Sequence, residues 1–330
     1  MSAERRRYCG VRFALRVKIL FNKEIDMGFF GGGYDKPGRG VDKNAPKKKG
    51  LFLYIELISR KFTNFLHAGI LYSLFSIPLI VLIYLLTVFV LAQPINAIAH
   101  TALDIMQKNG IAQEEISGQL GTITFGICST VTVFFLSMWS AGPLSAGLSY
   151  VFRCFTREQP VWVWSDGKDK VLENMKQGFL VLLIDVLVFV LAPTAITFYY
   201  NMSLANESMS FFTTLIIYVL LLGLLIYTMM HPFMFQLMVT FKCGFSELFK
   251  NSLLIMLAHL PVCVLLTAIS TALITIPFGL FGVSGSVVLV IVGFTFGYAI
   301  VRYPMEFYAA RIIKKTYLDK AEKAKIEYEE

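Results

Sequence analysis

Six long apolar segments dominate the hydropathy pattern of this chain. They cover residues 68–92, 120–143, 178–198, 211–230, 252–277 and 286–302. Each is near or above the roughly 17–20 apolar residues that a helix needs to cross the hydrocarbon core of a bilayer. None shows the two-residue alternation of a barrel strand. Because lipid-embedded backbone must be hydrogen-bonded within a helix or a closed barrel, the pattern predicts an all-α, polytopic bundle of six transmembrane helices.

The basic residues are segregated to one side of these segments. When the gaps are numbered alternately from an inside N-terminus, 22 of the 30 Lys and Arg residues lie in inside segments from Met27 onward, and only Lys108 lies outside. This asymmetry predicts a multi-pass cell-membrane protein with both termini in the cytoplasm. The net charge of +8 then matches the anionic lipids of the inner leaflet as a partner and requires no nucleic acid.

The chain divides into four parts. Residues 1–26 are too interrupted by basic residues to span a membrane and lack a signal-peptide core. Lys23 and Glu24 can be encoded as a ribosome-binding sequence two codons before Met27, so we expect 1–26 to be a non-native upstream extension. The alternative is a disordered basic extension. We expect 27–50 to be a disordered basic cytoplasmic segment, 51–317 the membrane domain and 318–330 a charged cytoplasmic tail.

Amphipathic lead-in segments precede the odd-numbered spans. Residues 51–66 place apolar side chains on one side and carry an i,i+4 pair, Glu56 and Arg60. Such a helix either lies along the cytoplasmic membrane surface or extends the first span. Comparable lead-ins before the third and fifth spans suggest three repeated hairpins, each with an amphipathic helix followed by two spans. Similar membrane environments alone would also explain this likeness.

The segment after the second span contains candidate interface residues. Gly142 and Pro143 end or kink the span, and Gly147 permits close helix approach. Arg153 and Arg157 are placed to face the inner headgroups.

A loop with two tryptophans follows. Trp162 and Trp164, next to Asp166, either anchor at the membrane interface or dock a cytoplasmic partner.

A family resemblance rests on this region. The runs GPLSAGLSYVFR from Gly142, Arg157-Glu158, VWVWSD from Val161 and NMKQ from Asn174 resemble the YesL-like family of bacterial integral membrane proteins. The run MGFFGGGYDKPGRG from Met27 is similar to a clostridial-type branch of that family. The resemblance implies a companion of carbohydrate-uptake or sensing systems. It makes the residues from Gly142 to Asp166, Glu158 included, a candidate docking surface.

Candidate chemistry inside the spans is sparse. Asp185 lies about 10 Å into the third span at about 1.5 Å per residue, and His259 lies at comparable depth in the fifth. An intramembrane acid is costly, so the two residues are a candidate polar pair, either a proton-linked element or a buried hydrogen bond. The five cysteines have no CxxC spacing and are expected to be free thiols. Without HExxH, GxSxG or Walker motifs, we expect no enzyme activity, no cofactor and no bound metal.

Two functions remain open from the sequence. The first is an accessory or assembly component of a carbohydrate uptake or sensing system, contacting permease or sensor-kinase subunits. The second is a self-contained small-solute transporter, which Asp185 would couple to protons. Proline within the spans, at Pro78, Pro193 and Pro261, is the feature that favours broken transporter helices.

Overall fold

The computed structural model describes residues 50–92, 101, 103–110, 113–205, 209–292 and 297–318. The expected start at Met27, the segment 27–49 and the tail beyond Leu318 lie outside these residues. Within the described part of the chain the regular structure is helical, and Tyr54–Ile313 forms one compact unit. A separate unit contributes residues 50–53 and the π-helical turn Lys314–Leu318.

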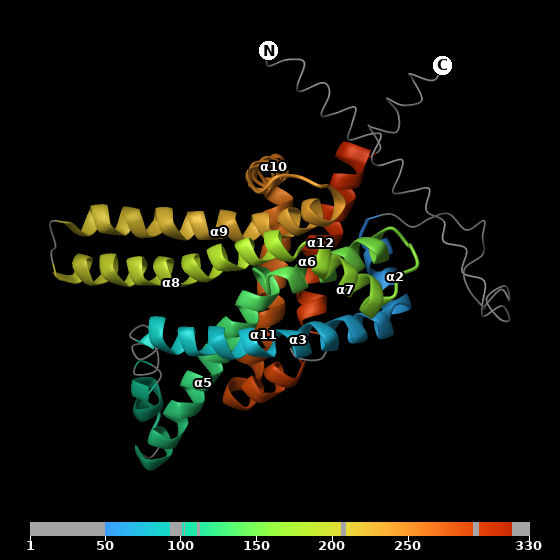
Figure 1. Ribbon diagram of the computed structural model, residues 1–330. Coiled ribbons are helices and arrows are strands. Elements are labelled where there is room, and N and C mark those ends of the chain that lie inside the picture. The colour runs from blue at the N-terminus through green and yellow to red at the C-terminus, as the bar shows by residue number, and fades with distance from the viewer. Residues whose placement is uncertain are drawn as a thin grey trace, which may run out of the picture. The chain divides into compact units, whose positions relative to one another are not determined.

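Three single helices are long and apolar enough to span a membrane. They are α3 (Phe62–Val90), α8 (Met175–Ala205) and α9 (Ser210–Thr240). The helices α8 and α9 contain the predicted third and fourth spans, and α3 covers the first span up to Val90. Figure 1 shows α8 and α9 side by side as a long hairpin. Pro78 and Pro193 lie inside α3 and α8 without ending them.

Two further candidate spans are broken. The helix α5 (Gln113–Met138) is followed, after a 60° bend, by α6 (Pro143–Thr156). The helix α10 (Phe245–Ala258) meets α11 (Leu260–Val292) at a 95° bend. The described residues thus hold three candidate spans, or five if each bent pair counts as one.

The predicted fifth and sixth spans differ from the structure. Residues 252–277 are interrupted at His259, and Pro261 in the first turn of α11 has no backbone N–H with which to continue the hydrogen bonds of α10. Residues 278–285, predicted to be a loop, belong to the 33-residue helix α11. The predicted segment 286–302 covers the end of α11 and the start of α12 (Tyr298–Ile313), and residues 293–296 between them lie outside the described part of the chain.

Short helices lead into the long ones, as the sequence predicts. They are α2 (Leu51–Arg60) before α3, α7 (Val163–Glu173) before α8, and α10 before α11. Backbone hydrogen bonds from Lys61 N–H to the Leu57 carbonyl and from Phe65 N–H to the Lys61 carbonyl cross the α2–α3 junction. The first lead-in helix is therefore joined to α3 by backbone hydrogen bonds, and whether it lies along the membrane surface or extends the span stays a prediction. Shared ancestry of the three units stays a prediction.

Candidate functional site

The candidate site lies at the break between α5 and α6. Ser140 and Ala141 are not helical, Gly142 has a φ of +62°, and Pro143 begins α6. Glycine adopts positive φ without steric cost, and proline at the first helical position loses no hydrogen bond. The Ser145 hydroxyl accepts the Ala141 N–H at 2.8 Å, which holds the turn in place. The break frees polar groups that a continuous helix would have used internally.

The carboxylate of Asp185 is the centre of the first polar cluster. Its side chain on α8 is fully buried. Ser140 donates from the break to Oδ2 at 2.5 Å, and Tyr227 donates from α9 to Oδ1 at 2.6 Å. The Nε2 atom of His231, one turn further along α9, lies 2.7 Å from the same Oδ1. Three elements that are distant in sequence therefore converge on one carboxyl group.

The hydrogen bonds of His231 define where a proton resides. Its Nδ1 lies 2.9 Å from the Tyr227 carbonyl, which only accepts hydrogen bonds, so Nδ1 carries a hydrogen. The contact between Nε2 and Asp185 Oδ1 then holds one further proton. Neutral imidazole with carboxylic acid, or imidazolium with carboxylate, each leaves the pair uncharged overall. The geometry therefore accommodates one shared proton between His231 Nε2 and Asp185 Oδ1 in a buried position.

The indole of Trp139 covers this pair. Its ring is stacked on the His231 imidazole, with centroids 6.1 Å apart and 9° between the planes. Its ring also meets Tyr227 edge-on at 5.4 Å, and its N–H donates to Thr228 Oγ1 at 2.8 Å. The aromatic rings exclude solvent from the pair, and low local polarity strengthens its hydrogen bonds.

A second buried cluster is formed by an ion pair on α12. Arg302 and Glu306 are one turn apart, and Arg302 Nε donates to Glu306 Oε1 at 2.9 Å. Ser149 donates to Oε1 at 2.5 Å and Gln236 donates to Oε2 at 2.6 Å. The Arg302 guanidinium also lies over the Phe235 ring at 5.1 Å. Arg302, which the sequence placed among inside-facing charges, is therefore an interior residue, 3% exposed.

The two clusters meet at the break. Arg302 Nη1 donates to the Trp139 carbonyl at 3.0 Å and to Ser145 Oγ at 3.3 Å. The next residue after Trp139 is Ser140, which bonds Asp185. Tyr72 of α3 adds a contact to Ser145 Oγ at 3.1 Å. A shift of the break would therefore change the hydrogen bonds of both buried clusters.

The predicted pairing of Asp185 with His259 is wrong in its partner. Asp185 bonds His231, whereas His259 ends α10 at the 95° bend and meets the ring of Tyr308 edge-on at 5.9 Å. Equal depth along straight spans was the basis of the prediction, and the bend removes that basis.

Most of the predicted docking residues are internal. A Cβ on Gly178 of α8 would lie 2.7 Å from Pro143 Cα, and one on Gly142 would lie 3.1 Å from Leu182, so these residues form the α6–α8 contact. A Cβ on Gly147 would lie 2.8 Å from the Gly167 carbonyl. Gly147 thus permits close helix approach, as expected, but within the bundle, and Gly142 also permits it.

The charged residues at the end of α6 also contact other parts of this chain. Arg153 donates to the Val239 carbonyl at 2.7 Å and to Thr240 Oγ1 at 3.0 Å, so it caps the end of α9 rather than facing headgroups. Arg157 caps α6 through its backbone N–H, and Glu158 accepts from Arg60 at 2.8 Å.

The two tryptophans of the predicted interface are both exposed but differ in their contacts. Trp162 is 70% exposed, and its backbone N–H donates to Asp166 Oδ2 at 2.9 Å at the start of α7. Trp164 is half-exposed and stacks on Phe75 of α3 at 5.2 Å. The sequence therefore identified the tryptophan loop, and the structure divides it into one free and one packed ring.

Sequence reasoning missed most of the site. Tyr227 and His231, and Arg302 and Glu306, are each spaced by four residues, which places each pair on one helix face. That spacing, within or next to apolar segments, is the signal that would have found them. Trp139 and Ser140 carry no such signal, because their role depends on the break.

The described residues contain no group of His, Cys, Asp and Glu side chains arranged to hold a metal ion. Cys128, Cys154, Cys243 and Cys263 are free thiols, and Cys9 lies outside the described residues. No protein-family model, curated protein or solved structure matches this chain.

Proposed function

We propose that this chain is an integral membrane protein that carries a small solute across the membrane together with a proton. The observation that supports this most strongly is the Asp185–His231 pair, which holds one proton in a fully buried position beside a broken helix. Ionisable side chains at membrane depth are expensive and characteristically mark proton and substrate pathways. Transporters build such sites at interrupted helices.

The charge of the pair supplies the coupling. With one proton shared, the Asp185–His231 pair is neutral, and a gain or loss of a proton leaves a net charge in a low-polarity environment. Ser140 bonds Asp185 directly and belongs to the break, so the charge change acts on the geometry of α5 and α6. Protonation would then select between arrangements of the break, as coupling requires.

The second cluster suggests the class of solute. Arg302 Nη2 and Gln236 Oε1 are buried and make no hydrogen bond to any described residue, although both side chains are bonded to Glu306. One is a donor and the other an acceptor, which suits a hydroxyl group that both accepts and donates. We therefore propose a small polyhydroxylated solute, which agrees with the carbohydrate context that the YesL-like resemblance implies.

The finer topology belongs to the same proposal. Six spans, both termini in the cytoplasm and residence in the cell membrane agree with the positive-inside asymmetry. We propose transport without chemical conversion of the solute.

An accessory role in a carbohydrate uptake or sensing system is the second candidate. The 70% exposure of Trp162 favours it, because a large free aromatic ring beside α7 suits a docking contact. Affinity purification from native membranes with Trp162→Ala is the test, and Phe198→Ala, which is 62% exposed on α8, is the control. Loss of permease or sensor-kinase subunits with Trp162→Ala alone would support this role.

The transport proposal is tested by a solute screen. Proteoliposomes on a solid-supported membrane are exposed to a panel of monosaccharides, disaccharides, polyols and amino acids under an imposed pH gradient. A current for hydroxylated solutes that reverses with the gradient supports the proposal. Absence of current for every solute, with correctly folded protein, would contradict it.

A further inference from the structure

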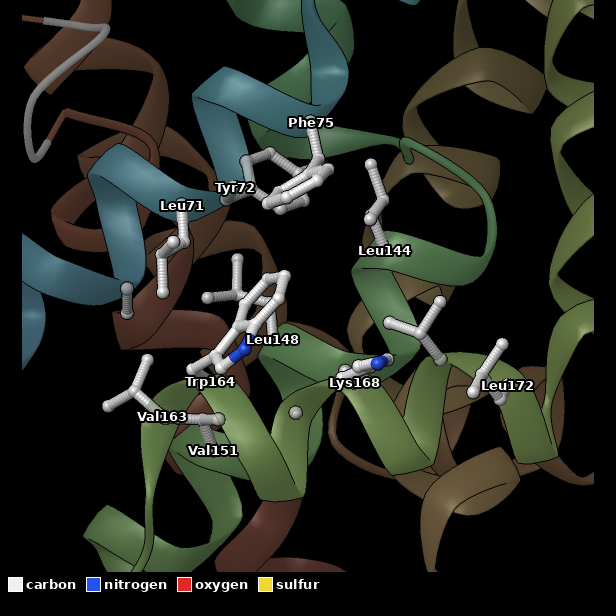
Figure 2. A pocket seen from close by; sticks show the side chains of 14 residues that line it. Leu71, Tyr72, Phe75, Leu144, Leu148, Val151, Val163, Trp164, Lys168 and Leu172 are labelled. Atoms are coloured by element: carbon white, nitrogen blue, oxygen red, sulfur yellow. The ribbon is translucent and has the colours of Figure 1, made fainter.

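An apolar cavity lies between α3, α6 and α7, separate from the buried ion pairs. Its volume is about 230 Å³. Figure 2 shows its lining, with Trp164 and Lys168 projecting from α7 and Phe75 from α3. Apart from Lys168, the walls are made by aliphatic, aromatic and glycine residues, among them Leu71, Leu144, Leu148 and Leu172.

Lys168 alone among the lining residues is charged. It is exposed, and its ammonium makes no ion pair or hydrogen bond with any residue that the structure describes. Lys170 differs, because it is bonded to Glu173 at 2.5 Å. Of the neighbouring acids, Asp166 accepts the Trp162 N–H and Asp169 is exposed. A cation thus stands at an apolar cavity without a protein partner.

Two uncharged polar side-chain groups, the Trp164 indole N–H and the Tyr72 hydroxyl, also belong to the lining. The Tyr72 hydroxyl donates to the Leu136 carbonyl at 3.0 Å and contacts Ser145 Oγ at 3.1 Å, so it belongs to the interior network. An occupant of the cavity therefore meets an apolar surface along its length and one positive charge at Lys168.

The cavity opens to the apolar exterior at the edge formed by α3 and α7. Three of its lining residues, Phe75, Trp164 and Leu172, are 47%, 51% and 56% exposed. Residues of this kind on a membrane-spanning helix face lipid chains. Tryptophan is enriched at the level of the lipid headgroups. An acyl chain can pass from this exterior into the cavity without crossing polar surface.

We infer that the cavity between α3, α6 and α7 is a binding site for an anionic phospholipid, with an acyl chain against Phe75, Leu148 and Trp164 and the phosphate on Lys168. Amphipathic occupants combine a long apolar part with a negative headgroup, and this cavity combines an apolar lining with one unpaired cation. The inference rests on insertion in a membrane but not on proton-coupled transport, so the two proposals fail separately.

Tryptophan fluorescence in nanodiscs tests the site. The chain has three tryptophans, and Trp139 is only 6% exposed. In a Trp162→Phe variant, Trp164 is therefore the accessible fluorescent reporter. The variant with the additional change Trp164→Phe gives the background fluorescence of Trp139. Nanodiscs of phosphatidylcholine receive increasing fractions of phosphatidylglycerol or phosphatidylcholine with brominated acyl chains, which quench nearby indoles.

We expect brominated phosphatidylglycerol to quench Trp164 at a mole fraction about fivefold lower than brominated phosphatidylcholine does. Lys168→Gln should remove this difference, whereas Lys250→Gln, an exposed change on α10, should keep it. Equal quenching by the two lipids, or a preference that survives Lys168→Gln, would show contact with bulk lipid only and overturn the site. No quenching by either lipid would show that another occupant fills the cavity, and it would also overturn the proposed phospholipid site.

Discussion

The indole ring of Trp139 lies parallel to the imidazole of His231, with ring centroids 6.1 Å apart. Trp139 is the first residue after α5, and His231 lies in α9. This contact places the break between α5 and α6 directly on the buried proton site. The geometry of the break and the protonation of the Asp185–His231 pair are therefore linked by packing as well as by the Ser140 hydrogen bond.

Trp139→Phe should destabilise the protein by about 1 kcal/mol. The substitution keeps an aromatic ring on His231 but removes the indole N–H that donates to Thr228 Oγ1 at 2.8 Å. The free energy of unfolding is measured by steric trapping in bicelles. Trp162→Phe, at a 70% exposed position, should change it by less than about 0.5 kcal/mol. Equal effects of the two substitutions on the free energy of unfolding would show that the Trp139 indole N–H does not stabilise the site.

Arg302→Met should destabilise the fold more than the double change Arg302→Met with Glu306→Met. Removing one partner leaves the fully buried Glu306 carboxylate without its cation, at a cost of about 3–5 kcal/mol, whereas an apolar pair removes both charges. Thermal unfolding in detergent ranks the variants. Arg311→Met is the matched change on α12, because Arg311 is exposed, and it should be close to neutral. A double variant less stable than the single one would contradict the ion pair.

Gly178→Ala should destabilise the bundle by about 1–3 kcal/mol. A Cβ at this position would lie 2.7 Å from Pro143 Cα, so α6 and α8 would have to separate. Gly223→Ala in α9 is the control, since nothing lies within 4 Å of a Cβ there and alanine favours the helix. The apparent melting temperatures of the two variants should therefore move in opposite directions. A fall of similar size in both would argue against the close contact.

The Glu173–Lys170 pair predicts a small acid sensitivity of α7. The hydrogen bond from Lys170 lowers the pKa of the Glu173 carboxyl below its ordinary value of 4.5. A lowered pKa contributes stability above the ordinary value, and that contribution is lost as the pH falls through the folded-state value. The effect is modest because the carboxyl is largely exposed. Trp164 fluorescence should report a loosening of α7 below about pH 4.5 that Glu173→Gln reduces. An unchanged profile would show that this pair does not hold α7.

The sequence was informative where apolar segments are continuous. The segments 68–92, 178–198 and 211–230 predicted α3, α8 and α9, because twenty apolar residues in lipid have few alternatives to a helix. Asp185 was found for the same reason, since a lone acid stands out in such a segment. Its partner was missed because pairing was judged from depth in straight helices.

The parts of the site that the sequence did not predict lie at the helix break between α5 and α6. Gly142 and Pro143 were expected to end or kink the second span, and the 60° bend confirms this, but no pattern indicated that the freed groups of Trp139 and Ser140 would bond Arg302 and Asp185. Contacts between residues separated by 45 and 163 positions depend on the packing of whole helices. The sequence around each of these residues therefore gives no indication of the long-range contacts.

Proton movement in Asp185→Asn proteoliposomes is the most direct test of the proposed coupling. Vesicles carry a trapped pH-sensitive dye, and each solute that gives a current with the wild-type protein is added outside. We expect wild-type protein and Asp104→Asn, an exposed acid outside the bundle core, to acidify the interior as solute enters. Asp185→Asn should lose the proton flux while retaining solute exchange at equal concentrations. Proton flux in Asp185→Asn equal to that of Asp104→Asn would contradict a coupling role for the Asp185–His231 pair.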